Sequence, residues 1–338
     1  MRKYLTDANS AHGYVSLQKE NLIGIENIYF FKNSHENLTN FMLCNLLKEL
    51  KKQRFCIEEV YSTFSPTLLS GIVVREKSIA FVSGKEPLEK STIIDFKEAY
   101  DSINEEQVFN LSEKMNNCYE EMHKHFNKAL KIHDEWEAIY IDNTDFEKAD
   151  LFKKTIISQV FDLPKKENIG LVVRRFFGTP CDEKYLDFIP DITSGLKRYF
   201  IKGRPGTGKS TLMKNIVSHT KNLGYYTEVY HCSLDPNSVD MVIVPEIDVC
   251  IFDSTSPHEY FPTEPTDEII DTYVEFVKVG LDEMFAQELN EINYRYKKEI
   301  KLGTKALKDA NKLKEQLNKI YDDKLNIDKA MKIFFRKR

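Results

Sequence analysis

The chain has 338 residues, of which 41% are apolar and 30% are charged, so it can form about two domains with buried cores and is not a disordered chain. The formal net charge of −5 argues against a general nucleic-acid binder. No run approaches the ~18 apolar residues of a membrane span. The six cysteines form no C-x-x-C pair, which indicates free thiols rather than a zinc site or disulfides. Because the first residues also lack the apolar segment of a signal peptide, we expect a cytoplasmic protein.

The first part of the chain contains short apolar segments that we expect to form an α/β unit. They occupy residues 28–32, 55–60, 72–76 and 79–82. Each has the length of a strand, and the set recurs in the same order later in the chain.

A long helical stretch follows, because apolar residues recur at alternating spacings of three and four, which is a heptad seam. His125 is its one polar position. His123 lies on a different helix face, so the two histidines do not suggest a metal pair. The seam leads into a second helix, for which Thr144 and Glu147 form a predicted capping box. The apolar seam positions are Leu111, Met115, Cys118, Met122, Ala129, Ile132, Trp136 and Ile139.

The second half opens with a predicted strand at 171–177, and then contains the most informative segment of the chain. Residues 203–211 read GRPGTGKST and fit the phosphate-binding pattern G-x-x-x-x-G-K-[ST] at every fixed position. A predicted strand at 198–202 precedes the segment, and an amphipathic helix at 212–221 follows it. Strand, glycine loop and helix are the context that the motif requires, which disfavours a chance glycine turn.

Each residue type in this loop has a physical role. The glycines would let backbone N–H groups turn toward a triphosphate. Lys209 would reach the β- and γ-phosphates, and the Ser210 hydroxyl would ligate Mg²⁺ at a helix N-terminus whose dipole favours anions. We expect the loop to bind nucleotide through Gly203, Arg204, Pro205, Gly206, Thr207, Gly208, Lys209, Ser210 and Thr211.

Residues 249–253 are four apolar residues followed by an aspartate, 44 positions after Lys209. This pattern predicts a buried strand whose terminal carboxylate, that of Asp253, faces the phosphate loop and holds Mg²⁺. Lys209 and Asp253 are therefore the predicted catalytic residues, and Ser210 and Asp253 the predicted metal ligands. A strand-ending turn is the simpler alternative for Asp253.

Self-comparison shows an internal repeat. Few residues are identical after a shift of 170 positions, but the order of apolar and polar residues agrees. With a boundary at the polar stretch 163–168, we predict a degenerate phosphate-loop-like domain at 1–166 and an active domain at 167–338. The matched segments are 28–32 with 198–202, 55–60 with 225–230, 72–76 with 242–246, and 79–82 with 249–252.

The same shift places residues 33–40 over the phosphate loop. This segment has no glycine, Thr39 replaces the lysine, and Glu36 would put negative charge against a phosphate. Ser83 stands where the second half has Asp253. We therefore expect the first half to keep the fold but not to bind nucleotide, with another ligand at 33–40 as the alternative.

The helical seam also recurs in the second half, with a shift of 181. Glu299 and Gly303 interrupt this copy, so we expect the helix to bend or break there. Asn326 precedes a second helix at 327–335. Each pair of helices is expected to form an antiparallel hairpin within its own half, or alternatively an arm for dimerisation or for a protein partner. The seam residues are Ile292, Tyr296, Ala306, Ala310, Leu313, Leu317 and Ile320.

Many motor-type ATPases have a glutamate directly after the strand aspartate, and it activates the attacking water. This chain has Ser254 at that position, so the general base must be another residue. The candidates are Asp235, Asp240, Glu246 and His258. Glu246 has a matched residue, Glu76, in the half that lacks the phosphate loop, so a structural role is favoured for it. Asp240 is a further candidate. Asp235 and His258 are better placed for the active half, although loop roles are also open to them.

Together these segments resemble a bacterial family of tandem P-loop proteins that are generally labelled ATPase or ATP-binding protein. The resemblance is carried by residues 131–140, 199–211, 229–240 and 251–261 and spans nearly the whole chain. It implies nucleotide binding and hydrolysis. In that family both halves can carry a phosphate loop, and this chain departs from the pattern at 33–40.

The expected fold class is α/β, with two P-loop NTPase-type units, each followed by a long helical hairpin. The first hypothesis is slow, partner-stimulated ATP hydrolysis with ATP and Mg²⁺ as cofactors. Adenine is the default base because no N-K-x-D guanine motif occurs. The alternatives are a nucleotide or small-molecule kinase and a non-enzymatic nucleotide switch.

Overall fold

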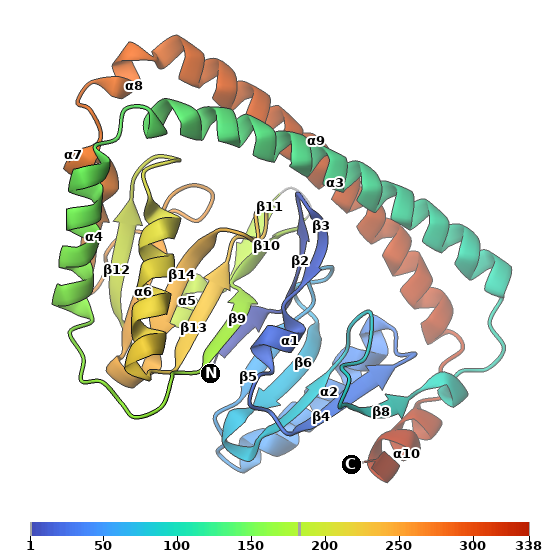
Figure 1. The fold of residues 1–338 in the computed structure, drawn as a ribbon. Coiled ribbons are helices and arrows are strands. Elements are labelled where there is room, and N and C mark those ends of the chain that lie inside the picture. Colours follow the sequence, from blue (N-terminus) through green and yellow to red (C-terminus); the bar gives the residue numbers. More distant parts are fainter. Residues whose placement is uncertain (1, 182–183, 338) are drawn as a thin grey trace.

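The computed structural model describes residues 2–181 and 184–337 and shows a mixed α/β protein built on one large sheet (Figure 1). Among the described residues, this sheet has twelve strands in the order β16-β12-β15-β14-β13-β9-β1-β5-β6-β7-β4-β8. The first half of the chain contributes β1 (Arg2–Leu5), β4 (Asn27–Lys32), β5 (Glu58–Tyr61), β6 (Leu69–Val74), β7 (Ile79–Val82) and β8 (Thr92–Asp95). The second half contributes β9 (Val172–Phe176), β12 (Lys197–Lys202), β13 (Thr227–His231), β14 (Val239–Val244), β15 (Val249–Asp253) and β16 (Glu268–Asp271).

The strand order repeats between the halves with the same register. In the first half Asn27 pairs with Ile79, and in the second half Lys197 pairs with Val249, so both partners are shifted by 170. The two halves also share a β-bulge at equivalent positions of β5 and β13. The repeat seen in the sequence is therefore a repeat of sheet topology.

The halves join through the antiparallel pair β1 and β9, next to a buried ionic cluster. Arg175 is fully buried, and its guanidinium lies 3.2 Å from Glu58 and 3.6 Å from Glu228. It also lies over the ring of Tyr4, 3.9 Å from its centroid. A buried arginine needs such partners because an unpaired buried charge is strongly destabilising. One charge thus ties equivalent glutamates of both halves together.

Shorter elements surround the sheet. In the described part of the chain, two antiparallel strand pairs lie outside it, formed by β2 (Asp7–Ser10) with β3 (Gly13–Ser16) and by β10 (Gly178–Cys181) with β11 (Lys184–Asp187). The short helices are α1 (Gln18–Asn21), α5 (Ile189–Thr193), α7 (Thr272–Phe276) and α8 (Leu281–Met284), with 3₁₀ turns at η1 (Arg75–Lys77), η2 (Lys97–Ala99) and η3 (Pro245–Ile247).

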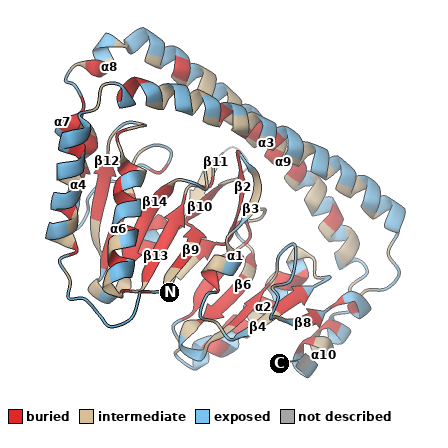
Figure 2. Ribbon diagram, in the orientation of Figure 1, coloured by how far each residue is buried: buried red, intermediate tan, exposed pale blue. Residues whose placement is uncertain are grey.

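Two helices cover the sheet at equivalent places, α2 (Glu36–Lys52) and α6 (Lys209–Leu223). In α6 the apolar residues Leu212, Ile216 and Val217 are buried in a cluster with residues of β12, β14 and β15. The amphipathic helix predicted at 212–221 is therefore confirmed. Figure 2 shows the strands as mostly buried and the outer sides of the helices as exposed.

The two long helical seams form α3 (Glu105–Ile141) and α9 (Ala286–Asp322), which pack against each other in antiparallel orientation (Figure 1). Of the bend or break expected at Glu299 and Gly303, a break does not occur, because α9 is continuous. His125 Nδ1 lies 2.7 Å from Glu299 Oε2, so the polar interruptions of the two seams meet. Phe126 packs where Gly303 has no side chain. None of the helices in the described residues is long and apolar enough for a membrane span.

The helices that follow the seams, α4 (Phe146–Val160) and α10 (Ile327–Lys337), are exchanged between the halves. Ile156 of α4 packs in the second-half cluster with Leu212. Ala330 and Phe334 of α10 pack in the first-half cluster with Phe31. The prediction of a helical hairpin packed within each half is therefore wrong, because each seam pairs with the other seam and each short helix covers the opposite half.

The predicted N-terminal cap is wrong for α4 and confirmed for α10. Asp145, not Thr144, is the N-cap of α4, since its carboxylate accepts a hydrogen bond from Lys148 N. The Thr144 hydroxyl instead donates to Tyr140 O at 2.7 Å. Asn326 accepts from Lys329 N at 3.0 Å, as expected for a residue that caps α10.

Candidate functional site: a glycine loop between β12 and α6

The glycine loop at 203–208 connects the end of β12 to the first residue of α6. Gly203, Gly206 and Gly208 have φ angles of 150°, 77° and 83°, which residues with a Cβ rarely adopt. A Cβ on Gly203 would lie 2.1 Å from the hydroxyl oxygen of Thr272. The predicted strand, loop and helix are all present, and the glycines are required by the local backbone.

Lys209 and Asp253 come together across this loop because β12 and β15 are neighbours in the sheet. The Lys209 side chain is largely buried, its Nζ donates to Arg204 O at 2.8 Å, and Asp253 Oδ2 lies 3.7 Å away. The other carboxylate oxygen of Asp253 accepts from the backbone and hydroxyl of Thr255. The two predicted catalytic side chains thus share one site.

The remaining loop residues have different surroundings. The Ser210 hydroxyl accepts from Val239 N at 3.0 Å, which links the start of α6 to the start of β14. The Arg204 guanidinium binds Asp282 at 2.7 Å rather than turning toward the loop. Thr207 donates to Arg204 O and contacts the Thr272 hydroxyl, whereas Pro205 is half-buried and Thr211 is exposed on α6.

Asp240 is the candidate base that lies next to Asp253. Because β14 is antiparallel to β15, with Met241 opposite Phe252, the start of β14 meets the end of β15. Asp240 is buried, and its Oδ1 accepts from the Ser238 hydroxyl at 3.1 Å. Burial, and then the negative charge of Asp253, raise the pKa of Asp240 to about 7. A carboxyl group with this pKa can accept a proton near neutral pH.

The other three base candidates differ in where the fold places them. Glu246 accepts from Tyr226 N, and Glu76 accepts from Cys56 N at the equivalent place, both at 2.9 Å. The structural role favoured for Glu246 is thus confirmed by the same contact in both halves.

Asp235 accepts a hydrogen bond from Asn237 N in its own loop, and its carboxylate lies 3.3 Å from His12 Nε2. His258 is buried against Phe177, with its Nε2 4.0 Å from Asp240. Burial lowers the pKa of His258. Among the described residues its Nδ1 has no hydrogen-bond partner. The structure therefore places His258, but not Glu246, beside the two aspartates.

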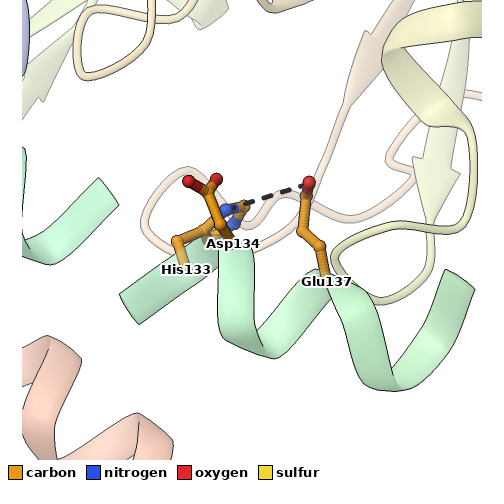
Figure 3. Close-up of side chains that lie close together, drawn as sticks. All are labelled: His133, Asp134 and Glu137. Carbon is orange, nitrogen blue, oxygen red and sulfur yellow. Dashed lines mark ion pairs between the residues drawn. The ribbon is translucent and has the colours of Figure 1, made fainter. Parts of the chain in front are cut away.

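Helix α3 of the first half also reaches the loop of the second half, which the sequence reasoning missed. A Cβ on Gly206 would lie 2.6 Å from the backbone oxygen of Glu137. One turn earlier, His133 faces the same side, and Asp134 is beside it (Figure 3). The segment 131–140 contributed to the family resemblance, but its spacing alone indicated only a helix.

The equivalent place in the first half has a different geometry. Without glycines, helix α2 begins at Glu36, the position matched to Gly206, so the loop is three residues shorter than its counterpart. The Glu36 carboxylate accepts from the hydroxyls of Ser62 and Ser65 and pairs with Lys314 of α9 at 3.0 Å. A carboxylate thus stands where the second half has an open glycine turn.

Comparisons with protein-family models, with curated proteins and with solved structures found no match to this chain.

Proposed function

We propose that the second half of the chain binds ATP with Mg²⁺ and hydrolyses it slowly, and that the first half does not bind nucleotide. The observation that carries this proposal is the approach of Lys209 to within 3.7 Å of Asp253 beside a glycine loop that opens a helix. A phosphate-binding lysine and a metal-binding carboxylate must share a site to act on one triphosphate.

The residues present fit magnesium and a triphosphate. Three glycines with positive φ leave backbone N–H groups unobstructed by side chains. Ser210 and Asp253 would hold the ion, which neutralises charge on the phosphates when bound. Lys209 would give up its hydrogen bond to the Arg204 carbonyl and donate to a phosphate instead.

Asp240 is the best placed residue to accept the proton from an attacking water. It lies at the same sheet edge as Asp253, and its pKa of about 7 suits a general base. Ser254 has no such role, since its hydroxyl donates to Tyr260 O at 2.8 Å and accepts from Tyr260 N. A general base whose pKa is raised by burial, in place of the usual glutamate, is consistent with slow turnover.

The test is ATP binding and phosphate release by the wild type and by Lys209→Ala. We expect one nucleotide per chain in the wild type, and neither binding nor release in the variant. Lys214→Ala is the matched control, because Lys214 is an exposed lysine of the same helix. Two equivalent sites, no site, or unchanged affinity in Lys209→Ala would contradict the proposal.

The same assay separates the alternatives. Binding without phosphate release identifies a nucleotide switch. ADP that forms only after a nucleoside or nucleotide is added identifies a kinase. Asp240→Asn should lower phosphate release without abolishing ATP binding, since the residue acts on the attacking group.

A further inference from the structure

One turn of α3 brings together three side chains that could ligate a cation. A ring nitrogen of His133 and carboxylate oxygens of Asp134 and Glu137 all lie within 4.8 Å of one another (Figure 3). Ligand bonds of about 2.0–2.2 Å hold the ligands of one divalent ion no more than about 4.4 Å apart. Small rotations of the side chains would therefore suffice to close this set around an ion.

The cluster borders the glycine loop although it belongs to the other half of the chain. Glu137 touches the loop through the approach of its backbone oxygen to Gly206. Burial lowers the pKa of His133, and the nearby charge of Lys209 acts in the same direction. A neutral imidazole has a lone pair available for a metal.

The first half, where no phosphate is expected, has a different residue at the position of α9 that matches His133 of α3. A shift of 181 puts Lys314 at the place of His133. There a cation of α9 meets an anion at the first residue of α2, because Lys314 Nζ lies 3.0 Å from Glu36 Oε1. The opposite arrangement holds in the second half, where Asp134 and Glu137 belong to the turn of α3 whose backbone borders Gly206 of the glycine loop.

Two carboxylates beside a bound triphosphate repel it unless a cation lies between them. We propose that His133, Asp134 and Glu137 bind a first-row divalent cation, distinct from the ion at Ser210 and Asp253, and that this second ion ligates the terminal phosphate. The imidazole ligand favours ions such as Mn²⁺ over Mg²⁺. Binding of the ion stands by itself, and only its contact with the phosphate rests on the proposed function.

The first experiment uses Mn²⁺ alone, titrated into the nucleotide-free protein and followed by electron paramagnetic resonance. We expect one Mn²⁺ with a ¹⁴N coupling from an imidazole ligand. His133→Ala should remove the coupling and weaken this site by about 10-fold or more, and Glu137→Gln should weaken it as well. Glu121→Gln is the matched control, because Glu121 forms an i,i+4 pair with His125 on the same helix, as Glu137 does with His133 in the reverse order.

Variants of the loop separate this proposal from the function of the nucleotide site. Lys209→Ala and Asp253→Asn should keep the imidazole-bound Mn²⁺. An ATP analogue should then bind more tightly with Mn²⁺ than with Mg²⁺ in the wild type, and this difference should vanish in His133→Ala. Absence of bound Mn²⁺ in the wild type, or an unchanged ¹⁴N signal in His133→Ala, would overturn the metal site. Retained ATP binding in Lys209→Ala would overturn only the proposed function.

Discussion

At the scale of single residues, the chemistry of the site depends on carboxyl groups from adjacent strands. Asp253 is held by Thr255 and faces Lys209, so its charge has partners. Asp240 is more deeply buried, accepts a hydrogen bond from the Ser238 hydroxyl, and has His258 Nε2 4.0 Å away. The raised pKa of Asp240 means that it keeps its proton to a higher pH than an ordinary aspartate does.

This difference predicts a pH dependence of stability. The pKa of Asp240 is about 7 in the folded protein and 3.8 as the ordinary value. Between these values the unfolded chain has lost the proton while the folded chain retains it. The contribution of Asp240 to stability is therefore complete below pH 4 and is lost as the pH rises through 7, with a slope of at most about 1.4 kcal/mol per pH unit.

Urea unfolding of the ligand-free protein at pH 5, 6, 7 and 8 measures this effect. Asp240→Asn has no proton to lose, so its stability relative to the wild type should increase up to pH 7 and then level off. Stability curves that remain parallel over the whole range would show that Asp240 ionises normally.

At the scale of elements, the long antiparallel pair of α3 and α9 depends on matched irregularities. His125 and Glu299 are polar residues in otherwise apolar seams, and they hydrogen-bond to each other. Phe126 is fully buried and occupies the space left by Gly303. A glycine within a helix costs about 1 kcal/mol relative to alanine, and here close packing of the aromatic ring accompanies it.

Gly303→Ala should therefore destabilise the protein, although alanine is the better helix former. The added Cβ would lie 2.5 Å from the Phe126 ring, and such overpacking costs about 1–3 kcal/mol. Thermal unfolding of Gly303→Ala, Phe126→Leu and the double variant gives the coupling, and we expect the double variant to lose less than the sum. Asn290→Ala, an exposed change on the same helix, is the control. Additive losses would mean that the two residues do not compete for space.

At the scale of the whole molecule, the exchange of α4 and α10 ties the halves together. Each α/β half has its core completed by a helix from the other half of the sequence. The same crossing carries α3 over the glycine loop, so the surroundings of this loop include residues from both halves. Neither half is a self-contained unit of packing.

This exchange predicts where a core substitution acts. Phe334 of α10 is buried against Phe31 and Phe81 of the first half. Phe334→Ala should cost about 3–5 kcal/mol and should speed amide hydrogen exchange in β4 and β7. Ile156→Ala on α4 is the reciprocal variant and should act on β12 and β15 instead. If Phe334→Ala sped amide hydrogen exchange in β12 and β15 more than in β4 and β7, the packing of α10 on the first half would be contradicted.

Much of the loop and of the strands around it could be predicted from the sequence because the signals are local. Glycines with positive φ, a lysine at a helix start and an aspartate at a strand end follow from short-range backbone chemistry. The shift of 170 then related the two halves. The position of Lys209 near Asp253 followed from the pattern, because neighbouring strands end at the same sheet edge.

Only the tertiary structure decided which residues meet over longer distances. A heptad seam or an amphipathic helix shows that one face is buried, but not which surface covers that face. The exchange of α4 and α10 and the continuity of α9 at Gly303 depend on such pairings, and so does the arrival of His133 and Glu137 at the loop. Local preferences specify each element, whereas the partners of its buried face are chosen by packing of the whole chain.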